Sequence, residues 1–224
     1  DYADYKKGAD TSERVGPLRV TQAGLVTPDT MKKATVIVFG MAVLAALYLM
    51  ARGGWPGVVL GVLSIISGIL YTAGPLPLGY VGLGDVFVLF FFGPVAVAGT
   101  YYVQTLKWVD YVVWAGLAPG LLATAILTVN NLRDMETDRK AGKKTWAVRF
   151  GSGFARAEYL VCVVGAFIIP LVLAAGYGEH SHVGFVSLAL LLALPLFHKI
   201  FSYSGAKLNP LLGQTARLLL MYSV

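Results

Sequence analysis

Six apolar runs dominate the sequence, and each is long enough to cross a membrane as a helix. They lie near 31–51, 56–73, 85–104, 108–129, 159–178 and 183–200. About 20 predominantly apolar residues span a hydrocarbon core of about 30 Å as a helix. Hydrophobic residues make up 57% of the chain and charged residues only 13%, which excludes a soluble globular enzyme and a disordered chain. We therefore predict an all-α fold, a polytopic transmembrane helical bundle.

The two ends of the sequence suggest that the bundle is incomplete. A seventh apolar run, 211–224, reaches the last residue before it is long enough to span, and the chain opens on Asp1 rather than on Met. We expect a single transmembrane domain over 1–224, truncated at both ends. The one cysteine, Cys162, excludes an internal disulfide and a cysteine-based metal site.

Basic residues are concentrated on one side of the predicted membrane. The segments 1–33, 130–158 and 199–207 contain 15 of the 18 Lys and Arg residues, whereas the opposite side has only Arg52 and Lys107. Because an even number of crossings separates these three segments, the positive-inside rule places all of them in the cytoplasm. We expect an integral protein of the bacterial cytoplasmic membrane. Its basic face suits anionic lipids or an anionic substrate rather than nucleic acid.

Two clusters of acidic residues lie on this predicted cytoplasmic side. Asp1 and Asp4 are three residues apart, and Asp134 and Asp138 are four apart, so each pair falls on one face of a helix. A divalent cation between the carboxylates removes their repulsion. Few hard oxygen ligands suit magnesium, which keeps its waters and bridges to phosphate oxygens. We interpret these four residues as metal ligands.

Basic and amide side chains accompany both clusters. The basic residues are Lys6, Lys7, Arg14 and Arg19 in the first, and Arg139, Lys140, Lys143 and Lys144 in the second. Asn130 and Asn131 are expected at the mouth of a transmembrane helix, where amides are costly unless they hydrogen-bond a ligand, a metal-bound water or backbone. For either cluster alone, solvated loop charges of alternating sign are an equally good interpretation. Both together indicate a site for a magnesium-bound diphosphate.

These motifs resemble those of a known family. The sequences DYADYKKGAD with VGPLRVTQAGL, and NNLRDMETDRKAGKKTWAVRFG, are similar to the two motifs of the UbiA-type intramembrane prenyltransferases, in the 1,4-dihydroxy-2-naphthoate prenyltransferase branch of menaquinone synthesis. LYTAGPLPLGYVGLGDVFVLFFFGPVAVAGTYYVQT, between them, also resembles that branch. The resemblance implies nine helices in the complete protein. It also implies an Asn just before Asp1, which this sequence does not contain.

The resemblance implies transfer of a polyprenyl group from its diphosphate to the naphthoate ring, with loss of the ring carboxylate as carbon dioxide. Mg²⁺ would be held by Asp1, Asp4, Asp134 and Asp138, and the diphosphate by Lys7, Arg139, Lys140, Lys143 and Lys144 together with Asn130 and Asn131. The allylic cation needs aromatic faces in a dry site. Tyr71 is the first candidate, and Phe90, Phe91 and Phe92 are weaker ones.

Other residues and other functions stay open. Arg19 and Gln22 lie in a loop that would close over the site, where Arg19 would pair with the acceptor's carboxylate or with the diphosphate, although solvated loop residues are an equal alternative. Asp85 is interpreted as a helix N-cap. Rival functions are prenylation of 4-hydroxybenzoate or homogentisate, phospholipid headgroup transfer, for which the D-G-x-x-A-R element is missing, and cation transport. Prenyl chain length and oligomeric state are left undetermined by the sequence.

Overall fold

The computed structural model describes residues 1–8 and 15–224, and the side chains of these residues except 178–181. Every regular element in the described residues is helical. Arg14 lies outside the described residues. The α-helices are α1 (Tyr2–Lys6), α2 (Pro28–Thr72), α3 (Gly84–Phe90), α4 (Ala96–Thr105), α5 (Asp110–Arg133), α6 (Met135–Lys140), α7 (Trp146–Gly176), α8 (Leu194–Ser202) and α9 (Asn209–Ser223). A π-helical turn, η1 (Phe91–Val95), joins α3 to α4, and 3₁₀ segments η2 (Gly178–Ala193) and η3 (Gly205–Leu208) flank α8. The all-α polytopic prediction is confirmed.

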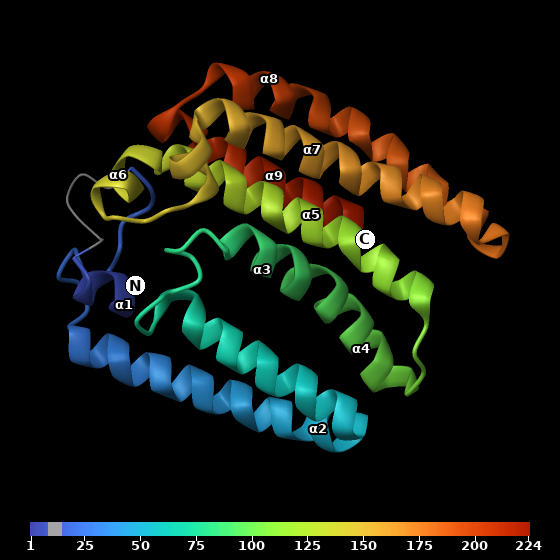
Figure 1. Ribbon diagram of the computed structural model, residues 1–224, viewed down its shortest axis with the longest axis horizontal. Helices are drawn as coiled ribbons and strands as arrows, with labels where there is room; N and C mark the ends of the chain where they lie inside the picture. The colour runs from blue at the N-terminus through green and yellow to red at the C-terminus, as the bar shows by residue number, and fades with distance from the viewer. Residues whose placement is uncertain (9–14) are drawn as a thin grey trace.

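Among the described residues, five helices are long and apolar enough to cross a membrane, and they contain the six predicted runs. The first, Pro28–Thr72, holds two runs because the chain reverses within it (Figure 1). Gly54 adopts φ 61°, a left-handed conformation that glycine tolerates without steric cost, and this breaks the helix into a hairpin. Gly57 lets the arms pack closely, since a Cβ there would lie 3.2 Å from the carbonyl oxygen of Leu49.

The start of the fifth run was predicted too late. We expected 159–178, whereas α7 begins at Trp146, capped by the Thr145 hydroxyl, which accepts a hydrogen bond from the Val148 amide. The helix is interrupted at Gly151, where φ is 85°. The polar residues between Trp146 and Glu158 concealed this part of the helix from a search for apolar runs.

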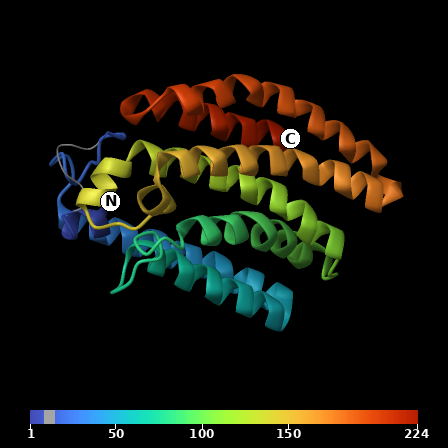
Figure 2. The same ribbon diagram turned by 45° about the horizontal axis from the view of Figure 1, so that its top comes forward.

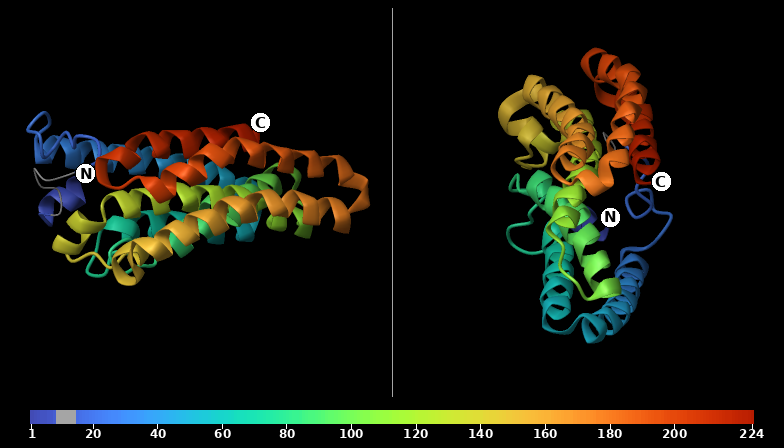
Figure 3. Two further views of the ribbon diagram at one scale, coloured as in Figure 1. Left: turned by 90° about the horizontal axis from the view of Figure 1, so that it is seen from above. Right: turned by 90° about the vertical axis from the view of Figure 1, so that its right-hand side faces the viewer.

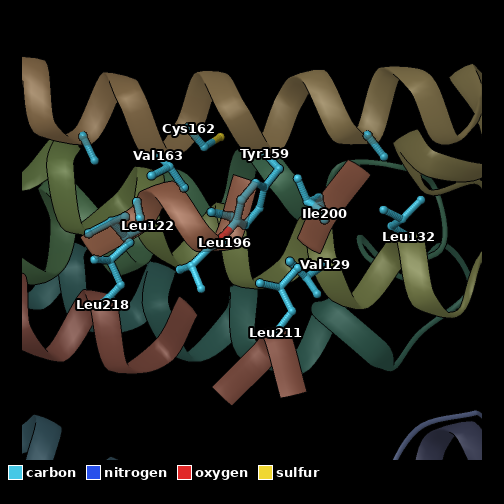
Figure 4. Packing of buried hydrophobic residues seen from close by; sticks show 14 of the residues in the cluster. Leu122, Val129, Leu132, Tyr159, Cys162, Val163, Leu196, Ile200, Leu211 and Leu218 are labelled. Carbon is cyan, nitrogen blue, oxygen red and sulfur yellow. The ribbon is translucent and has the colours of Figure 1, made fainter. Parts of the chain in front are cut away.

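Helix α5 is the centre of the bundle. Half of its apolar window is buried, compared with none of the window in α2, whose side chains would face lipid. Leu122 and Val129 of α5 lie against Val163 of α7 and Leu211 of α9 (Figure 4). Inside this core the Tyr159 hydroxyl lies 3.0 Å from that of Thr215, which satisfies both buried polar groups.

Helix α5 also meets the α3–α4 segment almost backbone to backbone. A Cβ on Gly93 would lie 2.7 Å from the carbonyl oxygen of Gly116 and 2.8 Å from the Cα of Gly120. Small residues permit such an approach between membrane helices. This contact positions the start of α3 beside the end of α5, where Asn131 lies.

The polar connections gather at one end of the bundle. Helices α1 and α6, the connection from α2 to α3 and the α8–α9 connection lie at that end (Figures 1 and 2), and the view from above shows the same grouping (Figure 3, left). Two hydrogen bonds hold these segments together: the Lys144 amide donates to the Tyr80 carbonyl at 2.7 Å, and Asn209 Nδ2 donates to the Val15 carbonyl at 3.1 Å. Both predicted acidic clusters are therefore at the same end.

This arrangement predicts which side of a membrane each connection faces. In a Cys162→Ala background, a cysteine replacing Ala206 should react with a membrane-impermeant thiol reagent only from the cytoplasmic side, and one replacing Lys107 only from the other side. Both positions are exposed and lie at opposite ends of the bundle. The basic segments fix the direction. Labelling of both cysteines from the same side would contradict the arrangement.

Candidate active site

A pocket of ≈ 160 Å³ lies between the two acidic segments at this polar end. Its lining includes residues from α1, from the α2–α3 connection, from the end of α5 and from the loop after α6. The lining residues are Asp4, Arg19, Tyr71, Thr72, Gly79, Tyr80, Leu127, Asn130, Asn131, Asp138, Lys143 and Thr145. One carboxylate from each cluster, both asparagines, Lys143, Arg19 and Tyr71 are thus brought together as candidate site residues.

Tyr80 joins the two clusters, although it is not among the residues predicted from the sequence. Its hydroxyl donates to Asp4 Oδ1 at 2.7 Å. The ammonium groups of Lys7 and Lys143 lie 4.8 and 5.1 Å from the centre of its ring, within the range of cation–π attraction. Tyr80 follows Gly79 in a turn, and no local pattern signals a partner 76 residues away. Its role becomes visible only when the chain has folded.

Asp138 is buried, with 6% of its surface exposed, and it is paired with Lys143. The Lys143 Nζ atom lies 3.0 Å from Asp138 Oδ1. Loss of solvent raises the pKa of Asp138, the Lys143 ammonium acts in the opposite direction, and the charges of Asp134 and Asp4 raise it further. Additional positive charge in the pocket would therefore stabilise the ionised carboxylate.

Asp134 is positioned differently from its predicted partner Asp138. Both of its oxygens accept hydrogen bonds from Arg133, at 2.7 Å from Nε and 2.5 Å from Nη2. Asp134 is 7% exposed and is not part of the pocket lining. The prediction of a metal-ligating role for Asp134 overlooked this adjacent cation.

Two observations bear on whether the residues fit a metal ion. Asp1 Oδ1 is buried and, within the described part of the chain, accepts no hydrogen bond. Asp4 and Asp138 supply carboxylates to the same pocket. Across residues 1–8 and 15–224, no group of three or more His, Cys, Asp and Glu side chains forms a metal cage. Oxygen ligands from one or two carboxylates are the set that suits Mg²⁺ held jointly by protein, water and phosphate.

The other predicted contacts lie outside the pocket lining. Lys7 donates to the Thr72 carbonyl at 3.0 Å, and Arg139 pairs with Glu136 at 2.7 Å on an exposed turn of α6. Lys140 and Lys144 are exposed, and Gln22 is partly buried in the loop before α2. Four of the predicted cations therefore lie outside the pocket lining.

Asp85 is not the N-cap that we predicted. The N-cap is Leu83, two residues earlier, and the Asp85 side chain turns inward with 2% exposure. Asn131 Nδ2 donates to Asp85 Oδ1 at 3.3 Å. This contact fixes the orientation of an amide that lines the pocket. Asp85 also lines a separate crevice of ≈ 360 Å³, together with Glu158.

Tyr71 lies where the polar pocket meets an apolar one. It also lines a pocket of ≈ 500 Å³ with Ser64, Ser67, Gly68, Phe87, Val88, Phe91 and Phe92. Phe90 is 48% exposed and does not contribute. A further apolar pocket of ≈ 500 Å³ shares Ser64 and Phe91 and continues along α2 and α4 to Gln104. Polar and apolar binding surfaces thus adjoin at Tyr71.

Comparison with known proteins identifies the family. The sequence model described as the UbiA prenyltransferase family matches residues 1–210. This chain belongs to the UbiA prenyltransferase family. Of its relatives named 1,4-dihydroxy-2-naphthoate octaprenyltransferase, the Haemophilus influenzae protein is 36% identical over 237 residues, covering 100% of this chain and 75% of the relative.

Two further relatives with the same name support the branch. The Escherichia coli protein is 40% identical over 216 residues, covering 94% of this chain and 69% of the relative. The Mycobacterium tuberculosis protein is 38% identical over 232 residues, with 100% and 76% coverage. The chain is therefore a prenyltransferase with helices that can span a membrane, which confirms the family and the class of enzyme predicted from the motifs.

The Tyr80 contacts yield a test of how the site is held together. Replacing Tyr80 with Phe should lower the free energy of unfolding by about 1.5–3 kcal/mol, because a hydrogen bond to a buried charged group is lost. Tyr80→Ala should lower it further, since both cation–π contacts are lost as well. Chemical unfolding in detergent micelles measures the change. Tyr48→Phe, at a side chain 73% exposed on α2, is the control. Equal stability of the two Phe variants would contradict the assignment.

Proposed function

We propose that the protein catalyses Mg²⁺-dependent transfer of a polyprenyl group from polyprenyl diphosphate to 1,4-dihydroxy-2-naphthoate, with decarboxylation. The C–O bond between the prenyl group and the diphosphate breaks, and its electron pair leaves with the diphosphate. The ring carbon that bears the carboxylate forms the new C–C bond. The electrons of the C–CO₂ bond then restore the aromatic ring as carbon dioxide departs, giving demethylmenaquinol, the reduced form of demethylmenaquinone. The observation that carries this proposal is the polar pocket that adjoins apolar pockets at Tyr71.

The polar pocket supplies the charges for diphosphate binding. Lys143 and Arg19 line it, and Lys7 lies over the Tyr80 ring at its edge. Asn130 and Asn131 present amide groups from the end of α5. Preorganised donors directed at the charge that develops on a leaving group supply a large catalytic contribution. Arg139, Lys140 and Lys144 would attract the anionic donor to the entrance.

The acidic residues would hold Mg²⁺ against the diphosphate. Asp4 and Asp138 face the pocket, Asp1 carries a buried acceptor without a hydrogen bond in the described residues, and Asp134 lies directly before α6. When bound, the metal would neutralise the charge on the departing diphosphate. Tyr80 and Lys143 would keep the carboxylates of Asp4 and Asp138 in place.

The apolar pockets suit the prenyl chain. Phe87, Phe91 and Phe92 place aromatic side chains beside Tyr71, and an aromatic face attracts a positively charged carbon. With the diphosphate in the polar pocket and the chain along α2 and α4, the reacting carbon would lie beside Tyr71. The apolar walls would keep water from capturing the allylic cation.

Arg19 is the candidate for recognising the acceptor. It belongs to the loop before α2 and lines the polar pocket. A guanidinium binds a carboxylate through two parallel hydrogen bonds, which would orient the naphthoate ring. Gln22 would assist from the same loop. With the basic segments in the cytoplasm of a bacterial cell, this soluble acid would enter from the cytoplasmic side.

The decisive experiment follows both products of the proposed reaction. Membranes containing the protein are supplied with Mg²⁺, a radiolabelled prenyl diphosphate and 1,4-dihydroxy-2-naphthoate labelled at its carboxyl carbon. We expect one carbon dioxide to be released for each prenyl group transferred. Prenylation with the carboxylate retained, or activity on 4-hydroxybenzoate or homogentisate alone, would favour another acceptor. Cation uptake by sealed vesicles without any donor would favour a transporter instead.

Asp138 provides the sharpest single substitution. Asp138→Asn keeps the size of the side chain and removes one negative charge from the pocket, so turnover should fall about 10²–10³-fold. Adding Asp134→Asn should cost little more, because groups that act on one cluster are not additive. Asp110→Asn, at an exposed carboxylate in the first turn of α5, is the control and should retain activity. Near-normal turnover of a folded Asp138→Asn variant at low Mg²⁺ would refute the assignment.

A further inference from the structure

We infer that Arg133 is a positioning residue, which orients Asp134 for metal binding and couples that orientation to the loop before α2 and to α9. This inference rests on the proposed function and concerns a residue outside the predicted site. Arg133 ends α5, and its side chain is only 1% exposed. A guanidinium is charged at every relevant pH, so at this depth it must be fully paired.

The contacts of Arg133 define the orientation of Asp134. Nε and Nη2 donate to the two carboxylate oxygens at 2.7 and 2.5 Å, a bidentate arrangement that restricts how the carboxylate can turn. A carboxylate has about four lone-pair sites, two on each oxygen. Arg133 occupies one site on each oxygen, and the remaining lone pairs stay available to a metal ion. The ion pair therefore orients the Asp134 carboxylate and leaves lone pairs on both oxygens for a metal ion.

The same guanidinium also contacts Asn130 on its own helix and Asn209 of α9, and through Asn209 it is linked to the loop before α2. Nη2 also donates to Asn130 Oδ1 at 2.8 Å, within the asparagine pair of the pocket. Nη1 donates to Asn209 Oδ1 at 3.1 Å, and Asn209 Nδ2 donates to the Val15 carbonyl at 3.1 Å. Arg133 thus connects α5, the first turn of α9 and the loop that carries Arg19.

Gly16 shows how closely this loop approaches. A Cβ at position 16 would lie 2.7 Å from Arg133 Nη2, so any side chain there would displace the guanidinium. Displacement of the guanidinium would rotate or release the Asp134 side chain, although none of the predicted metal ligands would have been replaced. The loop before α2, the start of α9 and the Asp134 carboxylate therefore all depend on the position of the Arg133 guanidinium.

Three substitutions separate positioning from simple stabilisation. Arg133→Lys keeps the charge but cannot make the two parallel hydrogen bonds. Gly16→Ala displaces Arg133 without changing it. Arg156→Lys is the control, because Arg156 is partly buried and its guanidinium, like that of Arg133, connects separate segments: it bridges α7 to the Ile200 and Tyr203 carbonyls, at 3.0 and 3.4 Å.

The measurement is the thermal stabilisation of each purified protein in nanodiscs by Mg²⁺ at a fixed concentration of inorganic pyrophosphate. Loss of a residue that orients a metal ligand lowers metal affinity about 10–100-fold. We expect Arg133→Lys to raise the half-saturating Mg²⁺ concentration by about 10-fold or more. Gly16→Ala should shift it in the same direction by less, and Arg156→Lys should leave it unchanged. In prenyl transfer, excess Mg²⁺ should partly restore the rate of Arg133→Lys.

The outcomes distinguish the inference from the function on which it rests. If Arg133→Lys and Gly16→Ala melt at lower temperature but saturate at the Mg²⁺ concentration of the unmodified protein, Arg133 is structural and the inference is wrong. The same conclusion follows if Arg156→Lys shifts the saturation equally. Should Arg133→Lys fail to fold, Gly16→Ala alone decides. If the unmodified protein transfers prenyl groups but shows no stabilisation by Mg²⁺ with pyrophosphate, only the inference falls. If it does neither, the proposed function falls with it.

Discussion

Four buried carboxylates at one end of an apolar bundle each require a partner, and the geometry of the candidate site follows from how they find it. Isolated ionised carboxylates are strongly disfavoured away from water. Asp4 is paired with the Tyr80 hydroxyl, Asp138 with the Lys143 ammonium, Asp134 with the Arg133 guanidinium and Asp85 with the Asn131 amide. Three of these pairs, those of Asp4, Asp138 and Asp85, connect different segments of the chain. Satisfying the charges therefore also closes the connections around the pocket.

Those parts of the site that depend on residue type and local spacing could be predicted from the sequence. Asp4, Asp138 and Lys143 were predicted from charge clusters beside apolar runs, and the two asparagines from amides at the mouth of a membrane helix; the structure brings them to one pocket. The membrane-spanning helices could likewise be predicted from the apolar runs, because a segment that crosses hydrocarbon must satisfy its backbone hydrogen bonds, as a helix does. The gathering of both acidic clusters at one end of the bundle followed from the even number of apolar runs between them.

Features created by long-range closure could not be predicted in this way. Tyr80 contacts Asp4 across 76 residues, and Asn209 contacts Val15 across 194. Nothing in the spacing of these residues marks the pairs. The errors have a different origin. Asp85 was assigned to a cap because helix α3 was started two residues late, and the early turns of α7 were missed because Arg149, Ser152 and Arg156 interrupt their apolar residues. The Arg139–Glu136 pair, at a helical spacing of three, was available in the sequence and was overlooked.

The location of the pocket explains why this chemistry belongs at a membrane boundary. Breaking an allylic diphosphate separates a highly charged anion from a carbocation, and no single environment stabilises both. Charged side chains and amides on one side of Tyr71 suit the anion, whereas Phe87, Phe91 and the apolar lining along α2 and α4 suit the cation and its chain. In the proposed reaction, the Tyr71 ring would therefore lie beside the bond that breaks. Because the polar half is assembled from α1, the α2–α3 connection, α5 and the loop after α6, its geometry depends on contacts such as that of Arg133, which touch neither reacting group.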